Sequence, residues 1–315
     1  MINFNQLRVF HHAAINTNFT TAGKELNITQ PAVSAHIRLF ESSSKLKLFK
    51  KRGRKIYLTE EGKALYDYTR KIFEYEKEIE NLIDDLRQLK RGILRLGTSK
   101  TYARYFMPYL ITSFRDEYPN IKIHLDEANS LDMIHSLLEF RNEIAIIARV
   151  EDNPEMCFIP FSREELVLIL PPTHPMTRRK SIELYELAEE PIISKEKGSE
   201  TRKLINSLFE DNGITPKILM ETSNTEFIKQ LVQKGEGISF LVKEALEAEL
   251  KSKKLATVPI KNHRIYLDVT IAHLKDQHLS PPAQAFLDML FRITPREKAD
   301  QGIRKIIDGM LDNWH

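Results

Sequence analysis

The chain has 315 residues, of which 42% are hydrophobic and 29% charged, so it is large enough for about two folded domains and is neither disordered nor collagen-like. No apolar run approaches the roughly 18 residues that a membrane span needs, and the N-terminus lacks the features of a signal peptide, so we expect a cytoplasmic protein with no membrane partner. The net charge of +3 is uneven, because residues 1–58 carry ten Lys or Arg against two acids. A basic segment on a mildly acidic body indicates one end that binds a polyanion, although a solvated basic face is the alternative.

The first 40 residues predict three short helices. Apolar residues from Phe4 to Ala14 recur at spacings of three and four, as on one face of a helix. Thr20 or Thr21 is the expected N-cap of a second helix that ends near residue 26. Thr29 is the expected N-cap of a third, since Pro31 suits a first helical turn. Two short helices joined by a tight turn favour a helix-turn-helix over about 20–39.

The outer face of the third helix and the segment after it carry the candidate DNA contacts. Short polar side chains and a guanidinium on that helix suit base edges and phosphates. Residues 48–58 place a glycine and five basic side chains between two β-prone stretches, which predicts a hairpin wing that binds phosphate. The alternative is a solvated loop. The predicted DNA-binding residues are Thr21, Gln30, Pro31, Ser34, His36, Arg38, Lys51, Arg52 and Arg54.

The run FTTAGKELNITQPAVSAHIRLFE, followed by LF, the basic wing and LTEEG, resembles the DNA-binding domain of LysR-type transcriptional regulators. The motif is specific because it fixes residue types over about 45 positions. Three residues depart from the usual pattern. Gly23 stands where a second Ala is common, Lys45 where a Gly is usual, and Ala35 where the family often has an Arg or Lys that contacts a base.

A long helix is expected over residues 59–91, with Thr59 as its N-cap and Gly92 at its end. Apolar residues alternate steps of three and four, which is the heptad repeat of a coiled coil. Burial against the body of the same chain is the alternative to dimerisation. The resemblance implies a dimer through this helix, and favours tetramers. The apolar seam comprises Leu65, Tyr68, Ile72, Tyr75, Ile79, Leu82, Leu86 and Leu89.

Residues 92–292 alternate strands and helices, which predicts α/β lobes built on parallel sheets with a cleft between them. The expected lobes are 92–160 with 266–292, and 161–265. This arrangement resembles the effector domain of the same family, which is built like periplasmic binding proteins. The predicted fold is therefore an α/β multidomain chain with a winged helix-turn-helix (1–58), a dimerisation helix (59–91), the two-lobed effector domain and a C-terminal extension (293–315).

Hydroxyl-bearing residues that follow strands and precede helices are the candidate effector contacts. Free amides at such helix starts bind anions, although each hydroxyl could equally serve as an N-cap. Gly198 would let the backbone approach a ligand. The resemblance adds positions near two further strand ends. The predicted effector-binding residues are Thr98, Ser99, Thr101, Asn129, Ser130, Ser199, Thr201, Thr222 and Asn224.

No nucleophile, dinucleotide or zinc motif is present, so we expect no enzyme, no metal and no cofactor besides a small, anionic effector. Cys157 is alone and is expected to be a buried apolar residue, with redox sensing as the alternative. The expected function is ligand-responsive transcriptional regulation. The predicted partners are double-stranded DNA at an interrupted palindrome and further copies of the chain, with RNA polymerase as an additional candidate. The rival hypothesis is a small-molecule enzyme or solute-binding protein with a two-lobed body.

Overall fold

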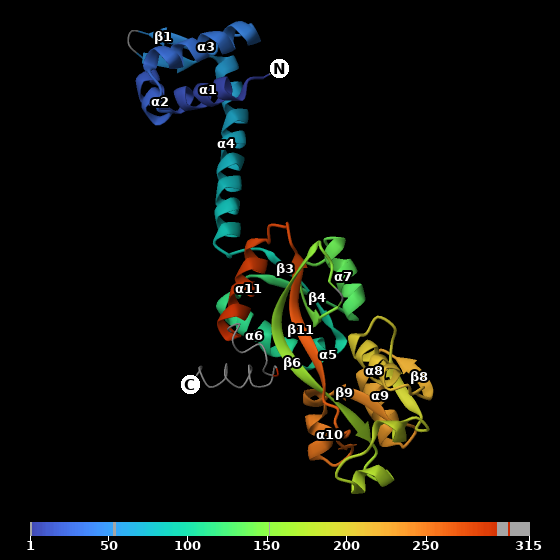
Figure 1. Ribbon diagram of the computed structural model, residues 1–315. Coiled ribbons are helices and arrows are strands. Elements are labelled where there is room, and N and C mark those ends of the chain that lie inside the picture. Colours follow the sequence, from blue (N-terminus) through green and yellow to red (C-terminus); the bar gives the residue numbers. More distant parts are fainter. Residues whose placement is uncertain (1, 53–54, 151, 295–301, 303–315) are drawn as a thin grey trace. The chain divides into compact units, whose positions relative to one another are not determined.

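A computed structural model describes residues 2–52, 55–150, 152–294 and 302, without the side chains of Arg52 and Lys55 (Figure 1). The chain divides into two compact units, Met1–Arg87 and Gln88–His315. The first unit contains α1 (Phe4–Asn16), α2 (Phe19–Glu25), α3 (Gln30–Ser44), β1 (Phe49–Arg52), β2 (Lys55–Leu58) and α4 (Glu60–Arg87).

The first unit is a winged helix-turn-helix whose three short helices share one apolar core with the hairpin. Leu7, Phe10, Val33 and Ile37 are buried in that core, and β1 and β2 pair antiparallel. Phe4, expected on the buried stripe of α1, is instead exposed.

The N-caps of this unit agree with the sequence-based predictions at two of three helices. Thr29 caps α3, accepting a hydrogen bond from the Ala32 amide, and Thr59 caps α4 through the Gly62 amide at 3.0 Å. The prediction of Thr20 or Thr21 as the cap of α2 is wrong. Asn18 has an extended backbone there, and its Oδ1 accepts hydrogen bonds from the amides of both threonines at 2.8 and 3.2 Å.

The helix predicted over 59–91 ends at Arg87, so Leu89 lies outside it, and the apolar stripe within α4 has two environments. In its first half, Leu65 and Ile72 pack against the core of the winged domain. Farther along, Tyr75 and Ile79 are 65% and 57% exposed, and Leu82 and Leu86 are 41% exposed. Only this second half, together with the exposed Tyr68, offers an unpartnered apolar surface among the described residues of the helix.

The second unit consists of two lobes with separate apolar cores. Leu96, Phe114 and Phe286 lie in the larger core of the first lobe, and Phe209 and Phe240 lie in a core of the second. The first lobe contains β3 (Ile93–Ser99), α5 (Lys100–Tyr105), α6 (Met107–Glu117), β4 (Lys122–Ala128), α7 (Ser130–Leu138), β5 (Ile144–Ala148) and α11 (Pro281–Ile293). The second lobe contains the 3-10 helices η1 (Pro175–Arg178), η2 (Leu184–Leu187) and η3 (Lys243–Leu246), the helices α8 (Glu200–Asp211), α9 (Thr225–Gln233) and α10 (Glu247–Lys251), and the strands β7 (Ile192–Lys195), β8 (Ile218–Thr222), β9 (Ser239–Val242) and β10 (Ala256–Thr257).

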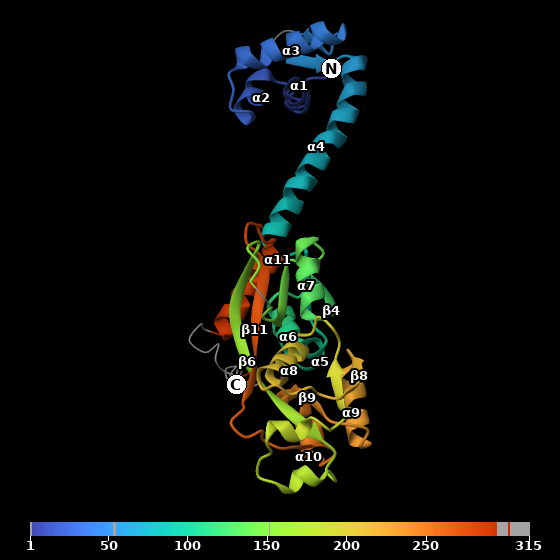
Figure 2. The same ribbon diagram turned by 45° about the vertical axis from the view of Figure 1, so that its right-hand side comes forward.

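Two long strands connect the lobes, β6 (Met156–Leu170) and β11 (Ile265–Leu274), and they lie side by side in both views of the ribbon (Figures 1 and 2). The expectation of parallel sheets is correct for β3 with β4 and β5, and for β7 with β8. It is wrong for β6, which pairs antiparallel with β9, β10 and β11, so the main sheet is mixed. The register shifts beside Pro160, because proline has no amide hydrogen to donate to the ladder.

Two smaller features of the first lobe concern α5 and β6. The short helix α5 is separate from α6, because Pro108 in the first turn of α6 cannot continue the hydrogen bonds of α5. Cys157, expected to be buried, is half-buried on β6, opposite His273 of β11.

Candidate functional site

The outer face of α3 carries five of the predicted DNA-binding residues. Gln30, Pro31 and Arg38 are exposed, whereas Ser34 and His36 are half-buried. Gln30 Nε2 donates a hydrogen bond to Ser34 Oγ at 2.8 Å, which fixes the amide at the N-terminal end of the helix. An oriented amide and an exposed guanidinium on the same helix can bind base edges and phosphate. Thr21 is exposed on α2.

The wing presents lysines from β1. Lys50 and Lys51 are exposed, and the strand register places Lys50 opposite Tyr57. The Arg52 side chain and Arg54, both predicted to bind phosphate, lie outside the described residues.

Glu41 fixes the wing to α3. Its Oε1 accepts hydrogen bonds from the Leu48 amide at 2.8 Å and the Phe49 amide at 3.2 Å, and Lys47 Nζ donates to Oε2 at 3.0 Å. Burial acts to raise the pKa of this carboxyl, but these hydrogen bonds outweigh burial and hold the pKa below its usual value. The position of the basic hairpin relative to α3 is therefore set by a charged group.

In the second unit, the N-terminal ends of several helices meet at a small cleft between the lobes. The cleft brings together six of the nine predicted effector residues, Ser99, Thr101, Asn129, Ser130, Ser199 and Thr201. Its wall is close-packed at one point: a Cβ atom on Gly198 of the second lobe would lie 2.8 Å from Asn129 Oδ1 of the first. The backbone approach predicted for Gly198 is thus made to the opposite lobe.

The hydroxyl and amide groups of the cleft fall into two classes. Ser99 and Asn129 are N-caps, since each accepts a hydrogen bond from an amide of its own helix. Ser199 stands at the N-cap of α8, a twelve-residue helix, and its side chain makes no capping hydrogen bond. The start of α8 therefore retains amide donors that its own cap leaves open, which is the arrangement that binds anions.

The other three predicted residues are engaged elsewhere. Thr98 is fully buried, and its hydroxyl donates to the Ile146 carbonyl at 2.8 Å. Asn224 caps α9 through the Phe227 amide, and Thr222 Oγ1 accepts from the Asn224 amide. Asn224 lines a neighbouring pocket with Lys100 and Ser223, not the cleft itself.

Two lysines in the cleft were missed by the sequence analysis. Lys195 at the end of β7 is only 8% exposed, and its Nζ donates to the Ser223 carbonyl at 2.9 Å and to Thr225 Oγ1 at 3.1 Å. Burial lowers its pKa, an effect that Glu196 opposes and nearby Lys100 reinforces. A buried ammonium group beside a second lysine is better stabilised by a bound anion than by the present hydroxyl and carbonyl partners. The sequence feature that could have identified Lys195 is its position directly after the short, mainly apolar run at 191–194.

Contacts between α5 and the start of α9 hold the lobes together beside the cleft. Lys100 Nζ donates to Ser223 Oγ at 2.8 Å, and the hydroxyls of Thr101 and Thr225 lie 3.3 Å apart. The cleft has a volume of about 40 Å³, enough for a few water molecules. A ligand of several heavy atoms therefore requires the lobes or their side chains to move.

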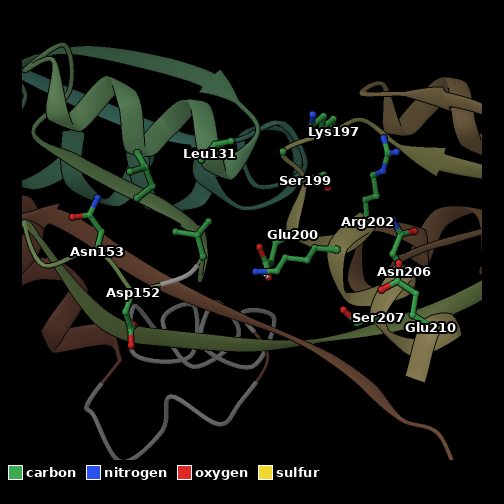
Figure 3. A pocket seen from close by; sticks show the side chains of 14 residues that line it. Leu131, Asp152, Asn153, Lys197, Ser199, Glu200, Arg202, Asn206, Ser207 and Glu210 are labelled. Carbon is green, nitrogen blue, oxygen red and sulfur yellow. Dashed lines mark ion pairs between the residues drawn. The ribbon is translucent and has the colours of Figure 1, made fainter. Parts of the chain in front are cut away.

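A wider groove adjoins the cleft and shares Ser199 and Glu200 with it. It has a volume of about 880 Å³. Figure 3 shows Leu131 of α7 on one side and Arg202, Asn206 and Glu210 along α8 on the other. Because the groove is continuous with the cleft, it gives a ligand a route between α7 and α8.

Neither metal ligation nor membrane insertion has structural support in the described residues. No group of three His, Cys, Asp or Glu side chains there could hold a metal ion. In the same part of the chain, no helix is both long and apolar enough to cross a membrane.

Comparison with known families gives two matches that together cover most of the chain. Residues 4–63 match "Bacterial regulatory helix-turn-helix protein, lysR family", and residues 87–293 match "LysR substrate binding domain". The first match spans the winged domain and the second spans both lobes.

Individual relatives agree with this division. The HTH-type transcriptional activator CmpR of Synechocystis is 35% identical over 286 residues, covering 91% of this chain and 94% of CmpR. The regulatory domain of Synechocystis CcmR, solved in complex with 2-PG, is 30% identical with a TM-score of 0.61, covering 65% of this chain and 98% of that domain. Corynebacterium glutamicum OxyR in its oxidized form shares the fold, with a TM-score of 0.76 at 20% identity, covering 99% of this chain and 96% of that chain.

Proposed function

Because the chain belongs to the family of LysR-type transcriptional regulators, we propose that it regulates transcription in response to a small anion bound in the cleft between its lobes. DNA-binding regulation is the shared function of this family, whose members are not enzymes. The anionic character of the effector is the specific part of the proposal. It rests mainly on one observation, the buried Lys195 beside the open N-terminus of α8.

Three groups favour an anion over a neutral ligand. Lys195 and Lys100 supply positive charge, and the first amides of α8 supply donors at the positive end of a helix dipole. The same cleft also contains Glu196 and Glu200. The 2-PG complex of the CcmR regulatory domain supports an effector in this domain.

For the DNA, we propose an interrupted palindrome read by two winged domains. Gln30, Ser34 and Arg38 would contact base edges, while Lys51 and the arginines of the wing would bind phosphates. The exposed half of the α4 seam would join two chains, and a twofold axis would then impose twofold symmetry on the site. Pairs of dimers would form the tetramer.

Binding of the effector would act through the lobes. An anion that contacts both Lys100 and the start of α8 bridges α5 and α8, which belong to different lobes. Its binding energy then differs between lobe arrangements, and only such a difference can shift the equilibrium between two states of the oligomer.

The test is ligand-induced stabilisation of the full chain with a defined panel. Inorganic phosphate and small carboxylates and phosphate esters of two to four carbons are compared with neutral alcohols of the same size. We expect some anions and none of the alcohols to raise the unfolding temperature. For the best anion, the combined Lys195→Met and Ser199→Ala changes should weaken binding at least about 10- to 150-fold, the range for one charged hydrogen bond.

The matched control combines Lys217→Met with Ser252→Ala, two exposed residues of the second unit that line neither the cleft nor the groove. The affinity of this control variant for the best anion should equal that of the unchanged chain. DNA affinity without effector should stay within about threefold in every variant, because the DNA-binding residues lie in the other unit. Equal stabilisation by anions and alcohols, or undiminished affinity in the double variant, would overturn the anionic effector.

A further inference from the structure

Gly302 of the C-terminal extension lies against two carboxyl groups of the second unit. A Cβ atom at this glycine would be 3.4 Å from Glu164 Oε2 and 3.4 Å from Glu244 Oε1, which is ordinary van der Waals contact. Gly302 itself is half-buried. Gly302 therefore lies at a point where β6 meets η3.

The two carboxyl groups are held in a poorly hydrated environment. Glu164 is fully buried, and its Oε1 accepts hydrogen bonds from the Tyr102 hydroxyl at 2.6 Å and from Ser162 Oγ at 2.7 Å. Burial, followed by the charge of Glu164, raises the pKa of Glu244 to about 7. The nearby Lys243 donates its own hydrogen bond to Glu165 at 2.8 Å. Positive charge brought to this pair would therefore be stabilising.

An apolar groove, which we call the junction groove, begins at the same place. It has a volume of about 1030 Å³ and runs between α5 and α6 of the first lobe and η3 and α10 of the second. Tyr105, Tyr109 and Leu250 contribute apolar surface to it, and charged side chains, among them Lys229 and Glu249, line its edges. Glu244 lines the groove and also lies next to Gly302, so the residues that follow Gly302 begin at the edge of the groove.

The sequence after Gly302 is complementary to both features. Arg304 and Lys305 follow the glycine closely, and Ile303, Ile306, Ile307, Met310 and Leu311 recur at the spacings of a helical face. These residues lie beyond position 293, where the family match ends, so they belong to this chain and not to the shared domain.

We propose that residues 303–315 dock in the junction groove of their own chain, with their apolar residues on the groove floor and Arg304 and Lys305 beside Glu164 and Glu244. Attachment through Gly302 makes the encounter intramolecular, with an effective concentration that a separate partner does not reach. The segment would contact helices of both lobes, and would therefore restrain the lobe movement that the cleft requires.

The first test places a photoreactive benzoylphenylalanine at Ile306 in the full chain. We expect cross-links to residues 104–109 or 243–251. Mixing isotopically light and heavy protein distinguishes the chain's own groove from that of a second copy. Cross-links only between light and heavy chains, or to other regions, would refute the proposal.

The second test measures amide hydrogen exchange in the same regions. Replacing both Arg304 and Lys305 by Ala should speed exchange in residues 243–251 at least about threefold, since a docked segment protects the backbone beneath it. The paired control replaces the exposed Arg178 and Lys180 by Ala, which removes the same charge elsewhere in the second unit. Equal exchange in both variants would show that the extension does not depend on the carboxyl pair. A chain ending at Gly302 should show a larger effect in residues 104–109 and 243–251, and unchanged exchange there would exclude docking altogether.

Discussion

Replacing Ile79 by Asp should separate chains that pair through α4. Ile79 is 57% exposed in the single chain, and complete burial of an isoleucine side chain contributes about 1.5–3 kcal/mol. The part still to be buried is therefore worth about 1–1.7 kcal/mol per chain, and a twofold axis doubles it to about 2–3 kcal/mol per dimer. The loss corresponds to about a 30- to 150-fold weaker dimer, before the cost of burying a carboxylate is added.

Ile72, at the same heptad position one repeat earlier, is unsuitable for this test. It packs on the core of the winged domain, so an acidic residue there would damage that domain directly. The matched control is Asn81→Asp, which adds the same charge to an exposed residue of α4.

The assay is sedimentation over a range of protein concentrations, combined with binding to DNA carrying one or two half-sites. The Ile79→Asp variant should lose association through α4 and lose the gain in affinity that a second half-site gives, while its affinity for one half-site stays unchanged. If it associates and binds as tightly as the Asn81→Asp control, the exposed stripe is not a dimer seam.

Three further predictions concern the winged domain. Replacing Lys51, Arg52 and Arg54 by Ala should weaken DNA binding regardless of sequence and reduce the slope of log affinity against log salt by about one for each phosphate that the wing no longer neutralises; an unchanged slope would remove the wing from the interface. Gly62→Ala should destabilise the unit by about 2 kcal/mol or more in chemical denaturation, because the added Cβ would lie 2.2 Å from the Leu48 carbonyl oxygen. Burial, with a smaller effect of its histidine neighbour, lowers the pKa of His11 to about 4 from 6.5. The folded state therefore favours the neutral imidazole, and up to about 3 kcal/mol of the free energy of unfolding should be lost as the pH falls from 6.5 to 4. A His11→Phe variant should lack this part of the pH dependence.

The winged domain could be predicted closely because its signals are local. The Thr29 cap, the position of Pro31 and the apolar spacing of Val33 and Ile37 all act within one or two helical turns. The cap of α2 was misplaced because Asn18 and the two threonines after it are all good N-cap residues, and the extended backbone at Asn18 decides between them.

The cleft was harder to predict because its members are distant in sequence. Alternating strands and helices correctly indicated that Ser99 and Ser199 would converge at helix starts, whereas Asn129 was placed there only by the family resemblance. The pattern could not show that Thr98 turns into the sheet, since the position of its hydroxyl depends on the pairing of β3 with β5. Lys195 was missed because an isolated lysine at the end of a strand is usually exposed, and its burial depends on Ser223 and Thr225 nearly 30 residues later.

The connection between the lobes was also beyond local pattern. The first half of β6 contains Pro160, Ser162 and Glu164, which suppress the usual alternation of a strand. Its extended conformation is imposed by pairing with β11, more than 100 residues farther along the chain. Strands specified by long-range pairing are the ones that sequence periodicity identifies least well.

In the dimer proposed above, the length of α4 would determine how each winged domain is rotated relative to the exposed stripe that joins the chains. Ile72, which packs on the winged domain, and Ile79, which faces solvent, are one heptad apart and lie on nearly the same side of the helix. Removing a single residue between them would rotate the outward stripe by about 100° relative to the DNA-reading face, whereas removing seven would rotate it by only about 20° and shorten the helix by about 10 Å. Natural variation in this segment should therefore come in whole heptads, each step bringing the same face of the winged domain to a differently spaced pair of half-sites.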